Sequence, residues 1–176
     1  MFDFLGVEVN TDKQSGKVTL AQGGLTKKVL KKVGMLDSHK TITPESTIPL
    51  VTDSDGPPFD EPWEYASVVV MLMYLSINSR PGMQFSVHYC DRFTYNPSRS
   101  HVEAVNSICR YLVGTQGQVF TFDPNIYMML ECYVNAYFAG LCKHKCDQDH
   151  LCVSSRNGYV MTLGGYTLRW LSKLHK

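Results

Sequence analysis

Apolar and polar residues change their spacing several times along the chain, and each change marks a new element. Two short apolar runs at residues 4–8 and 17–20 enclose a turn-forming segment at 10–16, which predicts a β-hairpin. From Leu25 the apolar residues recur at helical spacing up to residue 33, and Gly34 is a typical helix stop. The chain is therefore expected to begin with a hairpin and an amphipathic helix.

A connector and three helices are predicted for the middle of the chain. The five prolines between residues 37 and 62 stand among Ser, Thr and Asp, which is typical of an extended or mobile linker. Largely apolar residues 64–78 then end before a proline, residues 83–95 continue with helical spacing, and residues 99–112 end before Gly114. We therefore expect the middle to be helical after the linker.

The pattern changes to strands at the end of the chain. Residues 128–137, 158–163 and 167–171 have strand-like patterns, and Gly164 and Gly165 form a tight link between the last two. The predicted fold class is α+β, with an N-terminal β-hairpin, a helical middle and a C-terminal three-stranded antiparallel sheet. No helix is predicted after the sheet, so one of its faces is expected to be uncovered.

Composition and the lack of a long apolar segment narrow the class of protein. A chain of 176 residues with 44% hydrophobic residues can bury a sizeable core. The N-terminus lacks the basic and apolar segments of a secretory leader, and the longest apolar run, residues 68–75, is too short to span a membrane. We therefore expect an intracellular protein of the cytoplasm or nucleus, not secreted and not bound to a membrane, with its six cysteines reduced.

The net charge of +1 neither favours nor excludes an anionic partner, so the local distribution of charge has to decide. Four lysines lie on one face of the first predicted helix: Lys27, Lys28, Lys31 and Lys32. Such a stripe fits two interpretations, a solvated helix surface or a contact with the phosphate backbone of a nucleic acid. The residues alone leave both open.

Four residues near the end of the chain are candidate zinc ligands: Cys142, Cys146, His150 and Cys152. They crowd into residues 142–152, whereas zinc modules usually place two close pairs of ligands on either side of a longer loop. Thiols of a surface loop are therefore favoured over a zinc site. The other three cysteines have apolar surroundings and are expected to pack as small core residues: Cys90, Cys109 and Cys132.

His101 begins the last of the three predicted helices. A role as an acid or base would need a nucleophile or a carboxylate partner, and none stands at a meaningful spacing. A helix-capping or packing role is therefore the favoured interpretation.

Several short motifs follow one another along the chain: FLGVEV at 4–9, LAQ at 20–22, KKVL at 27–30, SRP at 79–81, RYLVGT at 110–115, YVNAYFAG at 133–140 and SRNGYV at 155–160. In order and wording they resemble FLGIEV, LSQ, KKIL, TRP, RYLKGT, YVDADFAG and SRTGYV in the Pol polyprotein of copia-type LTR retrotransposons. Because the motifs are separate and keep the order of the family, the resemblance is specific.

This resemblance implies a division of the chain into four parts. In the family, the stretch begins just after the polymerase palm, runs through thumb-like helices that hold the primer–template, and enters the ribonuclease H domain. The parts expected here are a hairpin and basic helix at 1–36, a linker at 37–62, a thumb-like or connection-like helical region at 63–126, and a truncated ribonuclease H-like domain at 127–176.

The resemblance also implies that the chain is not an enzyme on its own. Both family activities use two metal ions held by several carboxylates, and the YVDD-type aspartate pair of the palm is absent from the sequence. Asn135 stands at the position of the first ribonuclease H aspartate and Tyr137 at the second aspartate of the motif, and neither is an anion at neutral pH. The later acidic ligands of the family would lie beyond Lys176. We therefore expect no catalytic residues and no cofactor, although the intact family enzyme uses Mg²⁺.

The expected function is that of a retroelement-derived fragment whose ancestral role is to hold a primer–template or an RNA–DNA hybrid. The candidate nucleic-acid-binding residues are Lys27, Lys28, Lys31, Lys32, Arg110, Arg169 and Lys173. Two alternatives stay open. One is a structural or interaction protein that associates with itself or with a partner through the uncovered sheet, and the other is a non-functional relic.

Overall fold

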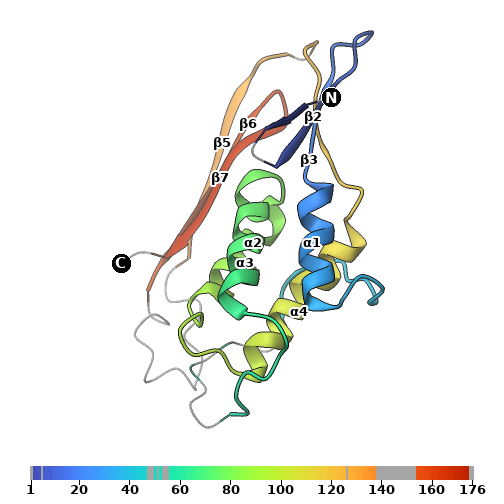
Figure 1. Ribbon diagram of the computed structural model, residues 1–176. Helices are drawn as coiled ribbons and strands as arrows, with labels where there is room; N and C mark the ends of the chain where they lie inside the picture. Colours follow the sequence, from blue (N-terminus) through green and yellow to red (C-terminus); the bar gives the residue numbers. More distant parts are fainter. Residues whose placement is uncertain are drawn as a thin grey trace.

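The computed structural model describes residues 2–4, 6–46, 50, 52, 56–125, 127–137 and 154–174. The elements within them are β1 (Phe2–Phe4), β2 (Val7–Thr11), β3 (Val18–Ala21), α1 (Gly23–Val33), α2 (Tyr65–Asn78), η1 (Pro81–Met83), α3 (Gln84–Asp91), α4 (Arg99–Gly114), β4 (Phe120–Phe122), β5 (Leu130–Tyr137), β6 (Arg156–Leu163) and β7 (Tyr166–Leu174). Figure 1 shows the C-terminal sheet, β5 to β7, along one side of the helices and the N-terminal strands at one end of them. The predicted α+β fold class is confirmed.

The N-terminal sheet is antiparallel, with the strand order β1-β2-β3-β4. The predicted hairpin is confirmed as β2 and β3, in which Thr11 lies opposite Val18. Residues 4–8 do not form one strand, however, because Gly6 has a left-handed conformation (φ 77°) and turns the chain between β1 and β2. The short strand β4 was not predicted, and it completes the sheet by pairing with β3.

The helices pack through the apolar faces that their sequence spacing places on one side. In α1, Thr26, Val29 and Leu30 are buried, while lysines occupy the opposite face. The same core includes side chains of α2 and α4: Val68, Val69, Leu72, Leu75, Val105, Ile108 and Leu112. The helices predicted at 64–78 and 99–112 are thus confirmed. In the described residues, no helix is both long enough and apolar enough to cross a membrane.

The helix predicted at residues 83–95 is shorter than expected. It starts as the 3₁₀ turn η1, with Pro81 at its first position, and α3 ends at Asp91. Beyond that point, the N–H groups of Phe93 and Thr94 donate to carbonyls three residues earlier. This tighter winding does not continue an α-helix, so the last residues of the predicted helix form a turn.

The start of α4 has a reciprocal cap built from Ser98 and His101. The Ser98 N–H donates to Nδ1 of His101 at 2.9 Å, and the Ser98 side chain meets the N–H of His101 in return. The imidazole is 1% exposed and stacks on Phe93, with 4.0 Å between the ring centres. The predicted capping and packing role of His101 is therefore confirmed, since the ring satisfies a backbone donor at the helix start.

The described part of the connector lies against the helices. Leu50 is 2% exposed, and its carbonyl accepts a hydrogen bond from the hydroxyl of Tyr89 at 2.9 Å. Nearer the start of the connector, the N–H of Thr41 donates to the carbonyl of Arg110. These contacts hold the connector along α3 and α4.

The C-terminal sheet is antiparallel, with the order β5-β6-β7. Gly164 and Gly165, with φ values of 56° and 81°, form the tight link between β6 and β7 that the sequence predicted. One face of the sheet packs on the helices, because Nε1 of Trp170 donates to the carbonyl of Ser76 at 2.8 Å and Arg156 lies against α3. We call this the inner face of the sheet.

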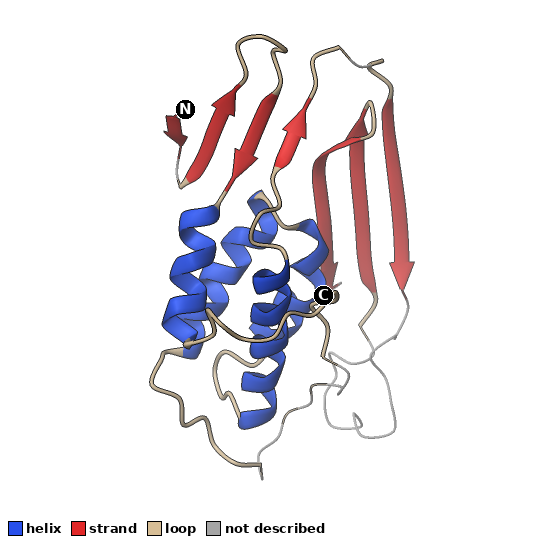
Figure 2. Cartoon of the chain, turned by 90° about the vertical axis from the view of Figure 1, so that its right-hand side faces the viewer, coloured by secondary structure: helices blue, strands red, loops and turns tan. Residues whose placement is uncertain are grey.

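The outer face of the C-terminal sheet is turned to solvent, as predicted. Side chains alternate along a strand, so Leu130 and Val134 lie on the face opposite Trp170, and they are 62% and 78% exposed. In Figure 2 the sheet stands beside the helices, with its edge strand β5 farthest from them. Because β5 extends past the helices, most of its side chains are exposed on both faces.

Candidate nucleic-acid interface

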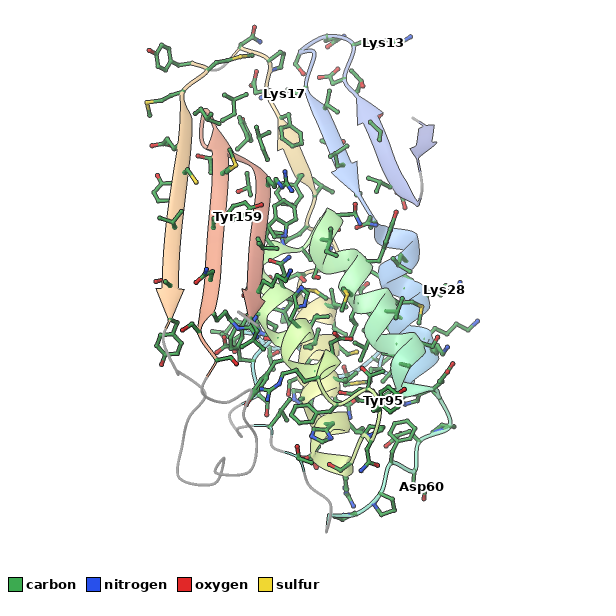
Figure 3. All side chains as sticks on the ribbon, turned by 90° about the vertical axis from the view of Figure 1, so that its left-hand side faces the viewer. Lys13, Lys17, Lys28, Asp60, Tyr95 and Tyr159 are labelled. Carbon is green, nitrogen blue, oxygen red and sulfur yellow. The ribbon has the colours of Figure 1, made fainter. Side chains whose placement is uncertain are left out.

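The four predicted lysines of α1 form one exposed surface, which we call the lysine face. Helical spacing places Lys27 and Lys28 one turn before Lys31 and Lys32, and all four side chains are exposed while the apolar side of α1 meets the core. Figure 3 shows Lys28 pointing away from the helices into solvent. Lys32 also donates to the hydroxyl of Ser67 on α2 at 2.7 Å.

No carboxylate neutralises the lysine face within the part of the chain that the structure describes. The ion pairs found there lie elsewhere, as in the contact of Lys17 with Asp123 at 3.1 Å. The first turn of α1 has no acidic residue, and Lys31 and Lys32 stand in its last turn, where the helix dipole favours cations. The lysine face therefore presents positive charge that is available to an external anion.

The ends of α1 hold the lysine face in a fixed position. At its start, the carboxylate of Glu8 accepts a hydrogen bond from the N–H of Gly24 at 3.3 Å. At its end, Gly34 adopts a left-handed conformation (φ 75°), and its N–H donates to the carbonyl of Lys31. The two rows of lysines are thus held about 6 Å apart along the helix axis, and such preorganisation reduces the ordering cost of binding.

Arg110 lies apart from the lysine face. It is half-buried on the side of α4 that meets the connector, where it lines a polar cavity of about 570 Å³ together with Glu45, Glu61 and Glu103. Its Nε is buried and has no hydrogen-bond partner among the described residues. Carboxylates in the same cavity oppose the approach of a phosphate. None of the four lysines lines this cavity, so the structure does not bring Arg110 together with them.

Arg169 and Lys173 also lie apart from the lysine face. Both side chains are exposed, and strand alternation places them with Leu171 on the outer face of β7, opposite Trp170. Figure 1 shows α1 and β7 on opposite sides of α2 and α3. The predicted cations therefore form separate surfaces, of which the lysine face is the densest.

Asn135 and Tyr137, which the resemblance aligns with the family aspartates, lie on the inner face of β5. Both side chains are exposed, and the backbone of Tyr137 lies opposite that of Arg156 in the register of β5 and β6. The carboxylate on this part of the sheet is Glu131, which accepts a hydrogen bond from the hydroxyl of Thr162 at 3.3 Å. Among the described residues, no three of His, Cys, Asp and Glu are grouped so that they could hold a metal ion.

A groove of about 300 Å³ separates η1 from the inner face of the C-terminal sheet. Its walls include the rings of Phe85, Tyr133 and Trp170, and Asn135 lies among them. None of the residues that line the groove is charged. The groove therefore offers apolar and aromatic contact surface together with amide hydrogen bonding.

The cysteines divide according to their burial. The zinc candidates Cys142, Cys146, His150 and Cys152 lie outside the described residues. Cys90 and Cys109 are buried core residues as predicted, and burial raises the pKa of each thiol to about 12. The prediction for Cys132 was wrong, because it is exposed on β5, both faces of which are open to solvent.

Sequence reasoning missed two buried arginines, Arg80 and Arg156, which are 3% and 7% exposed. Burial lowers the pKa of both guanidinium groups. Arg156 donates to the hydroxyl of Ser172 at 3.1 Å and lies 4.8 Å from the ring centre of Phe85. The SRP motif at residues 79–81 was a signal for Arg80, but nothing in a single sequence indicated its burial.

Comparison with curated proteins finds similarity to Pol polyproteins over nearly the whole chain. Over 98% of its length the chain is 30% identical to a Retrovirus-related Pol polyprotein from transposon RE2 of Arabidopsis thaliana. Over 98% it is also 32% identical to a Retrovirus-related Pol polyprotein from transposon TNT 1-94 of Nicotiana tabacum. The chain spans 11% and 13% of the lengths of these two relatives.

A third similarity covers a shorter stretch. Over 62% of its length the chain is 29% identical to Secreted RxLR effector protein 161 of Plasmopara viticola, of which the match covers 71%. No family model and no solved structure matches the chain.

Proposed function

Since the chain is a relative of the copia-type retrotransposon Pol polyproteins, as its motifs predicted, we propose that it is a non-catalytic module that holds nucleic acid. The proposed ligand is an RNA–DNA hybrid or a primer–template. The observation that carries the proposal is the lysine face, with four exposed lysines on one helix and no acidic partner among the described residues.

The lysine face suits the backbone of a nucleic acid more than its bases. Lysine is a compact point charge that reaches phosphate oxygens, and such contacts fix position without reading sequence. Each phosphate that a lysine neutralises releases condensed counterions, so the affinity falls steeply with salt. The proposed module therefore binds hybrids of different sequence with similar affinity.

The proposal includes no catalytic step and no cofactor. Cleavage or synthesis of a phosphodiester by two metal ions needs several carboxylates close together. The side chains at the family aspartate positions, Asn135 and Tyr137, offer an amide and a phenol instead. These substitutions support a role limited to binding.

The test is a fluorescence-anisotropy titration of a labelled RNA–DNA hybrid across a salt series. We expect saturable binding, with the logarithm of Kd rising linearly with the logarithm of the salt concentration. Hybrid that is incubated with the protein and Mg²⁺ is expected to stay intact. Replacing Lys27, Lys28, Lys31 and Lys32 by Ala should reduce the slope by roughly 0.9 for each phosphate that these lysines neutralise. A folded sample that does not bind hybrid at low salt would contradict the proposal.

A second candidate function is self-association through the outer face of the C-terminal sheet. The observation that favours it is the row of exposed apolar side chains on this face, including Leu130 and Val134. A stretch similar to this chain covers 71% of Secreted RxLR effector protein 161, so such a stretch also occurs in a protein that is not a full-length Pol polyprotein. The molar mass in solution distinguishes the two functions, because binding through the lysine face does not require a dimer.

A further inference from the structure

Arg80 lies at the joint between α2 and η1, and 3% of its surface is exposed. Its backbone N–H donates to the carbonyl of Leu75 at 2.9 Å and so closes the end of α2. The next residue, Pro81, occupies the first position of η1. The backbone of Arg80 is therefore fixed on both sides, which sets the direction of its side chain.

The guanidinium of Arg80 is only partly satisfied. Nη1 donates to Oε1 of Gln118 at 3.0 Å, while Nε is buried without a hydrogen-bond partner. In the described part of the chain, no carboxylate pairs with this cation. Burial lowers the pKa of Arg80, and the nearby phenol of Tyr111 acts in the opposite direction. A buried cation with a neutral partner costs stability until an anion compensates it.

A cavity of about 290 Å³ lies beside this guanidinium, and Arg80, Gly82, Tyr111 and Gln118 line it. A Cβ atom at Gly82 would come 3.1 Å from the Tyr111 hydroxyl, so the glycine leaves this part of the cavity open. No hydrogen bond joins that hydroxyl to another described residue. The cavity thus combines a cation with a hydroxyl donor, and Gln118 at its rim is exposed.

We propose that this cavity is a phosphate site, in which the Arg80 guanidinium and the Tyr111 hydroxyl donate to the oxygens of a phosphate group. A guanidinium presents several N–H donors in a planar fork that matches phosphate oxygens, and the hydroxyl approaches from a different residue and direction. The ligand is either free phosphate or the terminal phosphate of a nucleic-acid strand. No residue of the lysine face lines this cavity, and the site does not depend on hybrid binding there.

Thermal unfolding of the whole chain in phosphate, compared with chloride at equal ionic strength, tests the site. We expect a saturable rise in Tm, of roughly 5–10 °C at a phosphate concentration one hundred times Kd. Arg80→Met should abolish the saturable rise, because it removes the cation while keeping an apolar side chain of similar length. General salting-out by phosphate acts on both proteins alike and so cancels in the comparison.

Tyr111→Phe provides a second variant in case Arg80→Met does not fold. It removes one hydroxyl and keeps the ring, so we expect it to fold and to bind phosphate about ten-fold more weakly, as expected when one hydrogen bond is removed. A wild-type chain without a saturable response would overturn the proposal. An unchanged response in Arg80→Met, or an unchanged Kd in Tyr111→Phe, would also overturn it.

Two further comparisons identify the source of the phosphate and exclude the surface lysines. The variant with Ala at Lys28 and Lys31 should keep the phosphate response, and its loss would assign the response to the lysine face and overturn the proposal. A single strand with a 5′-phosphate is then compared with the same strand with a 5′-hydroxyl. Tighter binding of the former, dependent on Arg80, assigns the site to strand ends, whereas equal binding beside a response to inorganic phosphate assigns it to free phosphate.

Discussion

His101 shows how a single side chain can serve both a helix end and the core. Its ring accepts the N–H of Ser98 at the start of α4 and stacks on Phe93 in the interior. Replacing it by Ala would leave that backbone donor unsatisfied and open space beside Phe93. We therefore expect His101→Ala to lower the free energy of unfolding by about 2–3 kcal/mol, measured by urea denaturation.

Glu103 provides the control for this prediction on the same helix. Its side chain is 57% exposed and its contact with Arg99 is a surface pair at 3.9 Å. Glu103→Ala is expected to change the free energy of unfolding by less than about 0.5 kcal/mol. Equal destabilisation of both variants would contradict the role assigned to His101.

Predictability at the residue scale depends on whether burial follows from local spacing. The lysines of α1 were predicted on an exposed face because helical periodicity alone separates them from Val29 and Leu30. The burial of Arg80 depends on α4 and on Gln118, which stand far along the chain, so no local pattern indicates it. Cys132 was misassigned because an apolar neighbourhood in sequence does not show that β5 extends past the helices.

At the scale of elements, the two ends of α1 determine how firmly the lysine face is held. Gly34 has φ 75°, and a Cβ there would meet no atom within 4 Å, so the cost of a side chain is purely conformational. Gly23 lies within the helix, where a Cβ would make an ordinary contact of 3.7 Å with the Glu8 carboxylate. The same substitution should therefore have opposite effects at the two ends.

We expect Gly34→Ala to destabilise the protein by about 1 kcal/mol and Gly23→Ala to stabilise it by about 0.5 kcal/mol. The first change forces a side chain into the left-handed region, and the second reduces the freedom of the unfolded chain. Both changes are to be measured by urea unfolding, and the slopes of the unfolding curves are expected to stay unchanged. A Gly34→Ala variant as stable as the wild type would contradict the left-handed end of α1.

The sequence predicted the long elements and missed the shortest strand. α2 is largely apolar over 14 residues and α4 has apolar residues at helical spacing over several turns, and patterns of this length indicate a helix from the sequence alone. β4, in contrast, has three residues and exists because it pairs with β3, about a hundred positions earlier in the chain. Pairing over such a distance leaves no local pattern. The turn at Gly6, which splits the first predicted strand, was also not recognised from the sequence.

At the scale of the whole molecule, α1 and the C-terminal sheet lie on opposite sides of α2 and α3 (Figure 1). This separation allows hybrid binding and self-association to be disrupted independently. Val134 is 78% exposed on the outer face, in the middle of the edge strand β5, so a charge there should be tolerated by the fold. It would be costly only if a second chain covered it.

We therefore expect Val134→Lys to leave the unfolding curve nearly unchanged. If the outer face joins two chains, light scattering coupled to gel filtration should give the molar mass of one chain for the variant. The wild type should then have the molar mass of two chains. Wild-type chain at monomer mass over the whole accessible concentration range would contradict self-association through this face. Hybrid binding is expected to be the same in both proteins.

The most direct test of the central claim compares two double variants that change the net charge equally. Lys28→Ala with Lys31→Ala removes half of the lysine face, and Lys13→Ala with Lys40→Ala removes two exposed lysines elsewhere, of which Lys13 lies far from Lys28 in Figure 3. In salt-series titrations with RNA–DNA hybrid, the first variant should weaken binding and reduce the salt slope by roughly 2, while the second retains the wild-type slope. Equal weakening in both variants would mean that net charge alone attracts the hybrid, and would contradict the lysine face as the binding surface.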